Sequence, residues 1–240
     1  MPDQLIKHLE WDTTFFNFRV GRLLAQNRED FDLGLSIALE RQFRLLYWEI
    51  ETETTFSKRA KSTVQTFVGD QIRYRLNLAR TVDIPTSATH VITPYEYQNA
   101  DEELIALSIS AGHSSRFNLD QRIEESQFER LYRAWTQNSC QRRVADTTLV
   151  AKTRSGETIG FITAKTSTRT AAIGLIAVAA KYRGLGIGRS LIESIKNEAV
   201  NQHCDSLEVA TQLDNVAANW LYQRLGFKTK SITSFFHLWL

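Results

Sequence analysis

The stretch "KYRGLGIGRSL" at residues 181–191 places glycines at three alternate positions, directly before a segment with helical spacing. Glycine loses more backbone freedom on folding than other residues, so its use at a strand-to-helix junction needs a reason. Backbone N–H groups at the start of a helix, aided by the helix dipole, form a binding site for phosphate. The stretch therefore predicts a loop that holds a phosphate-bearing ligand.

Three kinds of phosphate-binding loop compete for this stretch, and a tight turn that packs a helix on a sheet is the alternative without a ligand. A P-loop ends in Gly-Lys-Ser/Thr, and no lysine directly follows these glycines. A dinucleotide fingerprint starting at Gly184 requires a third glycine where Arg189 stands. What remains is Arg-x-x-Gly-x-Gly, in which backbone N–H groups surround a pyrophosphate, formed by Arg183, Gly186 and Gly188.

The composition indicates an ordinary globular protein. The chain has 240 residues, 42% of them hydrophobic, and a net charge of +2, which speaks against a nucleic-acid partner. The longest nearly apolar run, residues 171–180, is too short to cross a bilayer, and the first residues lack an export pattern. Cys140 and Cys204 match no metal-ligand spacing. We therefore expect a cytoplasmic protein with no membrane partner and no metal site.

The hydrophobic spacing predicts an α/β protein. Helical spacing occurs at residues 32–42 (with Asp32 as the cap), 55–67, 99–111, 127–138, 188–202 and 215–226. Strand patterns occur at residues 15–25, 45–50, 71–78, 147–153, 158–166, 171–179, 206–213 and 232–240. A linker-like stretch at residues 82–90 suggests two domains, 1–84 and 90–240, and the three strands from 147 to 179 suggest a meander.

Two motifs, "LIAVAAKYRGLGIG" (175–188) and "NVAANWLYQRLGF" (215–227), resemble the GNAT superfamily of acetyl-CoA-dependent N-acetyltransferases. The resemblance covers about residues 90–240. It implies the GNAT acyl-CoA N-acyltransferase fold, a mixed central sheet flanked by helices, with acetyl-CoA as co-substrate. It further implies that the loop binds the CoA pyrophosphate through Arg183, Gly184, Gly186, Gly188 and Arg189.

The resemblance also implies that the strand before the loop splays from its neighbour. Its backbone at Leu175, Ile176 and Val178 would then bond the pantetheine arm and the acetyl carbonyl. The resemblance also points to residues of the second motif. Asn215, Asn219 and Tyr222 have i, i+4, i+7 spacing there and share one helix face.

In GNAT enzymes the asparagine position contacts CoA and the tyrosine lies near the thioester sulfur. A phenol there can protonate the departing thiolate. Tyr222 is therefore the candidate general acid, with Asn215 and Asn219 as cofactor contacts. The alternatives are an aromatic residue that only packs and, for Asn219, a solvated helix residue.

The general base is not evident from the sequence. Many relatives carry a glutamate near the splayed strand, yet "IGLIAVAA" (173–180) contains no acid. Water held by backbone carbonyls is one candidate. His113 and Asp120 are others, although a lone histidine is commonly structural.

Four further stretches resemble GNAT enzymes that acetylate the 4-amino group of dTDP-4-amino-4,6-dideoxy sugars, the TDP-fucosamine N-acetyltransferases: residues 9–23, 113–120, 128–139 and 235–240. This resemblance implies an N-terminal degenerate half-GNAT domain, a nucleotide-linked amino-sugar acceptor, and a role in surface polysaccharide biosynthesis. Candidate substrate-binding residues are His113, Arg116 and Asp120. Arg116 is the preferred phosphate contact, because arginine matches phosphate geometry.

Two other function classes stay open. A GNAT enzyme acting on a protein N-terminus, a lysine or an antibiotic would need acidic surface around the acceptor groove. A non-catalytic module that senses acetyl-CoA would not need Tyr222. The sugar epimer, and whether the chain forms a homodimer, also stay open.

Overall fold

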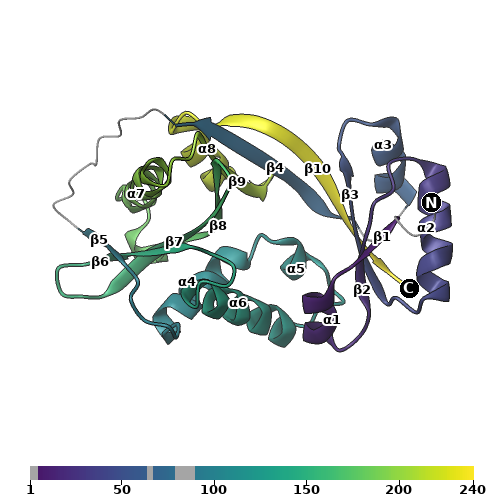
Figure 1. Cartoon of the computed structure of the whole chain (residues 1–240), viewed down its shortest axis with the longest axis horizontal. Helices are drawn as coiled ribbons and strands as arrows, with labels where there is room; N and C mark the ends of the chain where they lie inside the picture. Colours follow the sequence, from purple (N-terminus) through teal and green to yellow (C-terminus); the bar gives the residue numbers. More distant parts are fainter. Residues whose placement is uncertain (1–4, 64–66, 79–89) are drawn as a thin grey trace.

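The computed structural model describes residues 5–63, 67–78 and 90–240, whose strands form one mixed sheet of ten (Figure 1). In sheet order the strands are β1 (Ile6–His8), β2 (Val20–Leu23), β3 (Leu45–Glu51), β10 (Lys228–Trp239), β4 (Phe67–Asn77), β9 (Ser206–Gln212), β8 (Thr170–Val178), β7 (Thr158–Ser167), β6 (Thr147–Lys152) and β5 (Val91–Pro94). The α/β class and the mixed central sheet predicted above are confirmed.

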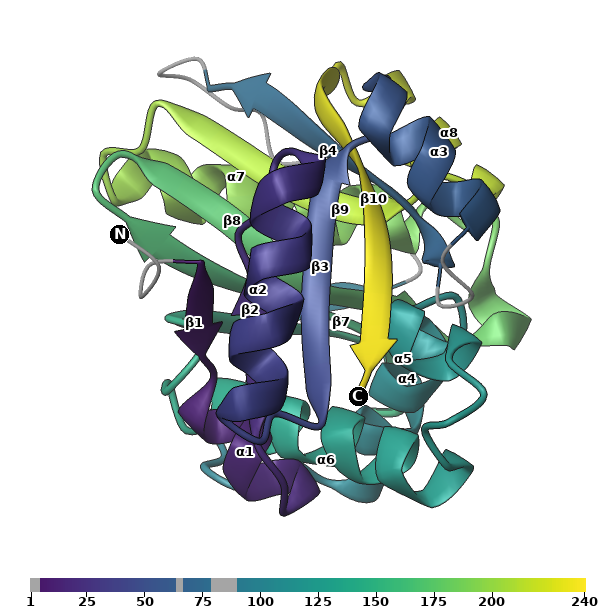
Figure 2. The same cartoon turned by 90° about the vertical axis from the view of Figure 1, so that its right-hand side faces the viewer.

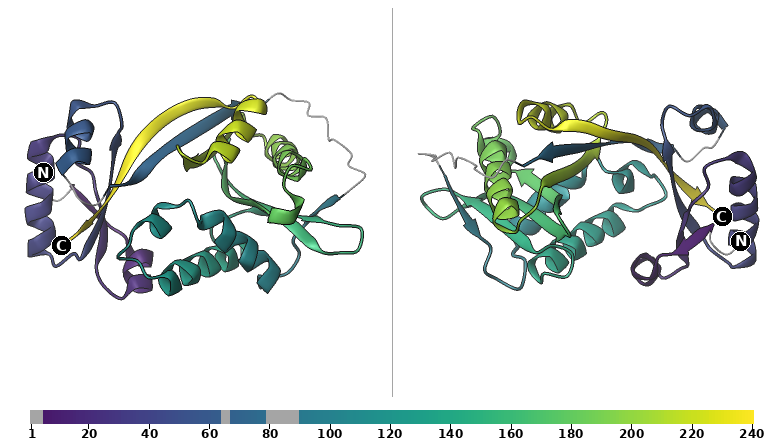
Figure 3. Two further views of the ribbon diagram at one scale, coloured as in Figure 1. Left: turned by 180° about the vertical axis from the view of Figure 1, so that it is seen from behind. Right: turned by 45° about the horizontal axis from the view of Figure 1, so that its top comes forward.

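Helices cover both faces of the sheet (Figures 2 and 3). They are α1 (Glu10–Phe16), α2 (Arg28–Glu40), α3 (Thr55–Thr63), α4 (Glu102–Gly112), α5 (Arg116–Leu119), α6 (Glu125–Cys140), α7 (Ile187–Asn201) and α8 (Val216–Arg224). Side chains alternate between the faces of each strand, so neighbouring residues enter different cores. On β3, Tyr47 packs with α4, α5 and α6, whereas Trp48 packs with α2 and α3.

Strand β10 joins the two ends of the molecule. Its residues 233–239 pair with β3, and its residues 228–236 pair with β4, which in turn pairs with β9 (Figure 1). Strands from the first third of the chain therefore alternate with strands from the last third. The division into residues 1–84 and 90–240 remains a prediction, and its linker lies outside the described residues up to residue 89.

Three local expectations about the first third of the chain were wrong. The helix expected at residues 55–67 includes Phe67, which is the first residue of β4. Helix α2 begins at Arg28 and is capped by Asn27, whose side chain accepts from the Asp30 N–H at 2.9 Å. Asp32 instead pairs with Arg28 at 2.6 Å, one helical turn inside. The segment 15–25 is not all strand, since α1 runs to Phe16 before β2 begins.

The strands that matter for the site are β8 and β9. The meander β6–β7–β8 is antiparallel as predicted, whereas β8 and β9 are parallel neighbours. They pair only where Thr170–Ile173 faces Ser206–Val209. Beyond these residues the two strands share no ladder, so a gap opens between their carboxyl ends.

Candidate active site

The loop that leads into α7 has the backbone conformation that its glycines predicted. Gly184 and Gly186 have φ values of 80° and 81°, in the left-handed region that glycine adopts without strain. A Cβ added to either residue would meet no atom within 4 Å. The backbone conformation, rather than crowding inside the protein, therefore requires these two glycines.

Gly188 has a different reason to be glycine. An added Cβ there would lie 3.2 Å from Leu221 Cδ2 on α8, so Gly188 allows α7 and α8 to pack closely. The role of Gly188 in holding the CoA pyrophosphate stays a prediction. Its N–H still belongs to the first helical turn, where backbone donors lack intrahelical acceptors.

Two exposed arginines flank these donors. Arg183 precedes the glycines, and its Nε donates to the Val178 carbonyl at 3.1 Å. Arg189 lies in the first turn of α7. Together with the N-terminus of the helix, the two guanidinium groups make this end of the sheet suitable for a diphosphate.

Strand β8 presents part of its backbone to the gap. The Leu175 N–H donates to Thr163 Oγ1 of β7 at 2.9 Å, beside an irregularity in the β7–β8 register. Because alternate residues of a strand direct their backbone groups to opposite neighbours, those of Ile176 and Val178 face away from β7. The backbone groups expected to bond a pantetheine arm thus differ. The Leu175 N–H is engaged within the sheet, and Ile176 and Val178 are directed away from β7, with the Val178 carbonyl accepting from Arg183.

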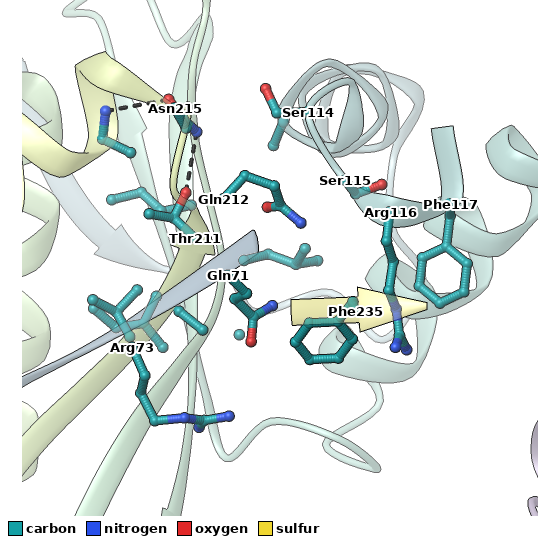
Figure 4. A pocket seen from close by; sticks show the side chains of 18 of the residues that line it. Gln71, Arg73, Ser114, Ser115, Arg116, Phe117, Thr211, Gln212, Asn215 and Phe235 are labelled. Carbon is teal, nitrogen blue, oxygen red and sulfur yellow. Dashed lines mark hydrogen bonds between the residues drawn. The ribbon is translucent and has the colours of Figure 1, made fainter. Parts of the chain in front are cut away.

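A cavity of about 360 Å³ occupies the gap (Figure 4). The carboxyl ends of β8 and β9, the start of α8, the end of α4 and helices α5 and α6 contribute to its wall. Strands β2, β3, β4 and β10 supply the remainder. Both ends of the sequence therefore line one cavity.

Tyr222 of α8 lines this cavity and is 2% exposed. Its ring packs against Tyr74 and Phe227, with ring centroids 5.8 and 5.7 Å away. Burial raises the pKa of Tyr222 above its ordinary value, and the neighbouring Tyr74 adds to the rise. The phenol therefore stays protonated at neutral pH, the form that a general acid requires.

The two asparagines of the motif have different surroundings. Asn215 lines the cavity and caps α8, accepting from the Ala218 N–H at 3.3 Å (Figure 4). Asn219 does not line it. Its amide donates to the Gln212 and Leu213 carbonyls and accepts from the Tyr74 hydroxyl. A cofactor contact by Asn219 remains a prediction, and the side chain is already engaged within the fold.

Of the three predicted acceptor residues, Arg116 lines the cavity. Its guanidinium lies 4.4, 4.7 and 5.1 Å from the ring centroids of Tyr47, Phe117 and Phe235. Burial among these rings lowers the pKa of Arg116 from its ordinary value, although a guanidinium remains charged in proteins. A desolvated guanidinium held by aromatic faces is well prepared for an anion.

His113 and Asp120 lie away from the cavity lining. His113 is exposed, and its ring stacks on Phe128. Asp120 is buried and accepts from His237 Nδ1 at 2.6 Å, Trp239 Nε1 at 2.9 Å and the Arg122 N–H at 3.0 Å. Burial disfavours its charged form, but these hydrogen bonds outweigh burial and lower the pKa of Asp120. Asp120 therefore anchors the end of α5, and neither residue is placed to serve as the base.

Sequence reasoning missed the polar residues that the first third of the chain contributes: Arg22, Glu49, Gln71 and Arg73. Figure 4 shows Gln71 and Arg73 at the cavity. A partial signal existed, because alternation in "QIRYRL" (71–76) puts Gln71 and Arg73 on one face of a strand. This alternation indicated a polar face of the strand, but it did not indicate that the face lines the cavity.

The described residues hold no group of three His, Cys, Asp or Glu side chains suited to a metal ion. None of the helices described is both long and apolar enough to span a membrane.

Comparisons with known proteins agree with this geometry. Residues 114–227 match the Acetyltransferase (GNAT) family. A GCN5-related N-acetyltransferase from Sphaerobacter thermophilus superimposes with a TM-score of 0.63 at 15% identity, over 92% of this chain and 72% of the other. A tandem GNAT protein from the clavulanic acid biosynthesis pathway gives 0.61 at 14% identity, over 92% and 75%. These similarities show the fold.

Sequence relatives cover shorter regions. The spore coat polysaccharide biosynthesis protein SpsD of Bacillus subtilis is 27% identical over 58% of this chain and 47% of its own length. N-alpha-acetyltransferase 30 of Saccharomyces cerevisiae is 40% identical over 23% and 31%. This chain spans about half or less of the relatives it matches. The structural similarities confirm the predicted GNAT fold, and within this fold residues 114–227 match the GNAT acetyltransferase family.

Proposed function

We propose that this chain transfers the acetyl group of acetyl-CoA to the 4-amino group of a dTDP-linked 4-amino-4,6-dideoxy sugar. The observation that carries the proposal is a single cavity lined both by residues suited to acetyl transfer and by residues suited to binding anions. The splayed strand and Tyr222 line the same cavity as three arginines, Arg22, Arg73 and Arg116. A nucleotide diphosphate brings anionic groups for those arginines.

Different residues would bind the cofactor and transfer the proton. The first-turn N–H groups of α7, with Arg183 and Arg189, hold the cofactor pyrophosphate, and the open Gly184–Gly186 backbone leaves room for it. Bound acetyl-CoA supplies an activated thioester. As the neutral amine forms the new C–N bond and the C–S bond breaks, Tyr222 gives its proton to the departing thiolate, and water takes the proton that the amine nitrogen loses. Alignment of the amine in the cavity contributes much of the rate.

The relative SpsD, named as a spore coat polysaccharide biosynthesis protein, supports a sugar acceptor of this kind. The identity of the nucleotide is the part of the proposal that rests on the resemblance in sequence.

The decisive experiment measures thiol release from acetyl-CoA with dTDP-linked 4-amino sugars of both epimers, the free amino sugars, and a peptide with a free N-terminus. A nucleotide-linked sugar should be the best acceptor, and the free sugar roughly a hundredfold poorer, because two charge-assisted hydrogen bonds are lost. Arg116→Ala should reproduce that penalty on the linked sugar alone. Equal efficiency for free and linked sugars in the wild type would refute the proposal.

A second candidate is acetylation of a protein N-terminus, which the 40% identity to N-alpha-acetyltransferase 30 over 55 residues favours. The peptide in the same panel tests it. Preferential acetylation of the peptide would establish this alternative. Acetyl-CoA binding without thiol release for any amine would indicate a sensing module.

A further inference from the structure

The cavity holds a carboxylate that the proposed chemistry has not yet used. Among the residues that line it in the described part of the chain, Glu49 is the one acid. Strand β8, which splays from β9, contributes no acid. Glu49 comes from β3, which lies on the far side of β10 and β4 from the splayed strands.

The pairing of the strands explains how Glu49 reaches the cavity. Glu49 is directly opposite Phe235 of β10, and Phe235 also lines the cavity. Gly69 of β4 is opposite Phe235 on the other side and carries no side chain. Next along β4, Gln71 and Arg73 line the same wall. Glu49 is thus one of a row of side chains on a single face of the sheet.

Glu49 keeps part of its hydrogen-bonding capacity. Its Oε1 lies 3.2 Å from Arg22 Nη1, and the two side chains are 35% and 40% exposed. Within the described residues this is the one ion pair of Glu49, so Oε2 can accept another donor.

The charges around Glu49 determine which kind of hydrogen-bond donor can bind to its Oε2. Three arginines, Arg22, Arg73 and Arg116, line the same cavity. A protonated amine entering among them is repelled except beside a carboxylate, since like charges a few ångströms apart repel strongly in a partly desolvated site. An acceptor that carries both an ammonium and an anionic group would satisfy both kinds of residue.

We infer that Glu49 binds the protonated amine of the acceptor, and that Arg73 and Arg116 take its anionic group. The first third of the chain, together with Arg116, then forms the acceptor subsite. This inference rests on the proposed transfer to an amine, and it goes beyond that proposal by naming the group that recognises the amine.

The test is binding, measured by calorimetry with the amino-sugar nucleotide and with its N-acetylated product, which lacks the positive charge. Glu49→Gln should weaken binding of the amine about ten- to a hundredfold and change binding of the product by less than about twofold. Glu51→Gln is the matched control, because Glu51 lies exposed on the same strand outside the cavity lining. Acetyl-CoA affinity should be unchanged in both variants.

Unchanged amine affinity in Glu49→Gln would overturn the inference, and so would an equal loss for amine and product, which would indicate a structural role. A peptide with a free N-terminus, and its N-acetylated form, are measured in parallel. If the wild type binds the peptide rather than the sugar and Glu49→Gln weakens that binding, the sugar proposal fails while the role of Glu49 stands. If the wild type binds neither amine, both are overturned.

Discussion

Tyr222 combines the two properties that its proposed role needs. Its side chain lines the cavity, and its burial keeps the phenol protonated. A hydroxyl that acts only while the C–S bond breaks contributes to turnover rather than to cofactor binding. The same burial is equally typical of a core aromatic residue, so kinetics must separate the two interpretations.

Tyr222→Phe should lower kcat by about 10²- to 10⁴-fold and leave the KM for acetyl-CoA nearly unchanged, because only the proton donor is lost. Steady-state kinetics with the best acceptor measures both. Tyr74→Phe is the control, since it removes a neighbouring buried hydroxyl that bonds Asn219 outside the cavity lining. Equal rates for Tyr222→Phe and wild type would show that Tyr222 only packs in the hydrophobic core.

Gly186 offers a second test at the residue scale. Gly186→Ala places a side chain at φ 81°, which costs roughly 1–2 kcal/mol of stability and distorts the loop. Acetyl-CoA binding should weaken at least tenfold by calorimetry. Gly156→Ala is the matched control, with φ 92° and equally open surroundings in the turn between β6 and β7. Similar melting temperatures with a loss of affinity only in Gly186→Ala would support the loop assignment, and equal affinities would contradict it.

Among the elements, α5 depends most on tertiary contacts. It has four residues, and Arg116 is the first of them. Asp120 at its end accepts from His237 and Trp239 of β10. A helix this short is not stable alone, so these hydrogen bonds hold Arg116 beside the cavity.

The Asp120–His237 pair makes stability depend on pH. Burial is the main cause that lowers the pKa of His237 below its ordinary 6.5, so folding favours the neutral ring. As pH falls below about 6.5, the unfolded chain takes up the proton first and the folded state loses stability. The lowered pKa of Asp120 extends this loss to more acidic pH.

We therefore expect the melting temperature to fall from pH 7 to pH 5, and to fall less in His237→Gln, which does not titrate. His203→Asn, at an exposed histidine, should keep the wild-type slope. Parallel slopes for the wild type and His237→Gln would rule out His237 as the group responsible.

At the scale of the whole molecule, the sheet makes the two ends of the chain interdependent. Strand β10 lies between β3 and β4, and β9 also needs β4. Expression of residues 90–240 alone removes both neighbours of β10 and exposes unpaired backbone groups. We expect this fragment to aggregate or to lack a cooperative melt by circular dichroism, whereas the full chain melts cooperatively. A monomeric, cooperatively folded fragment would support two independent domains instead.

The sequence by itself determined the features that depend on local spacing. The glycines of the loop, the meander and helix α8 with Tyr222 follow from turn chemistry and from periods of 2.0 and 3.6 residues. Spacing alone does not determine where a helix begins, because several polar residues near Asn27 can cap a helix.

Only the tertiary structure decided which residues share the cavity. Glu49 and Tyr222 are far apart in the chain, and they line one cavity because β10 and β4 bring the two ends of the chain into one sheet. Each strand's own pattern shows which face is polar, whereas the choice of neighbouring strand depends on the packing of the whole sheet. Apart from Arg116, the acceptor side of the site could therefore not be predicted from local patterns, while the loop side could.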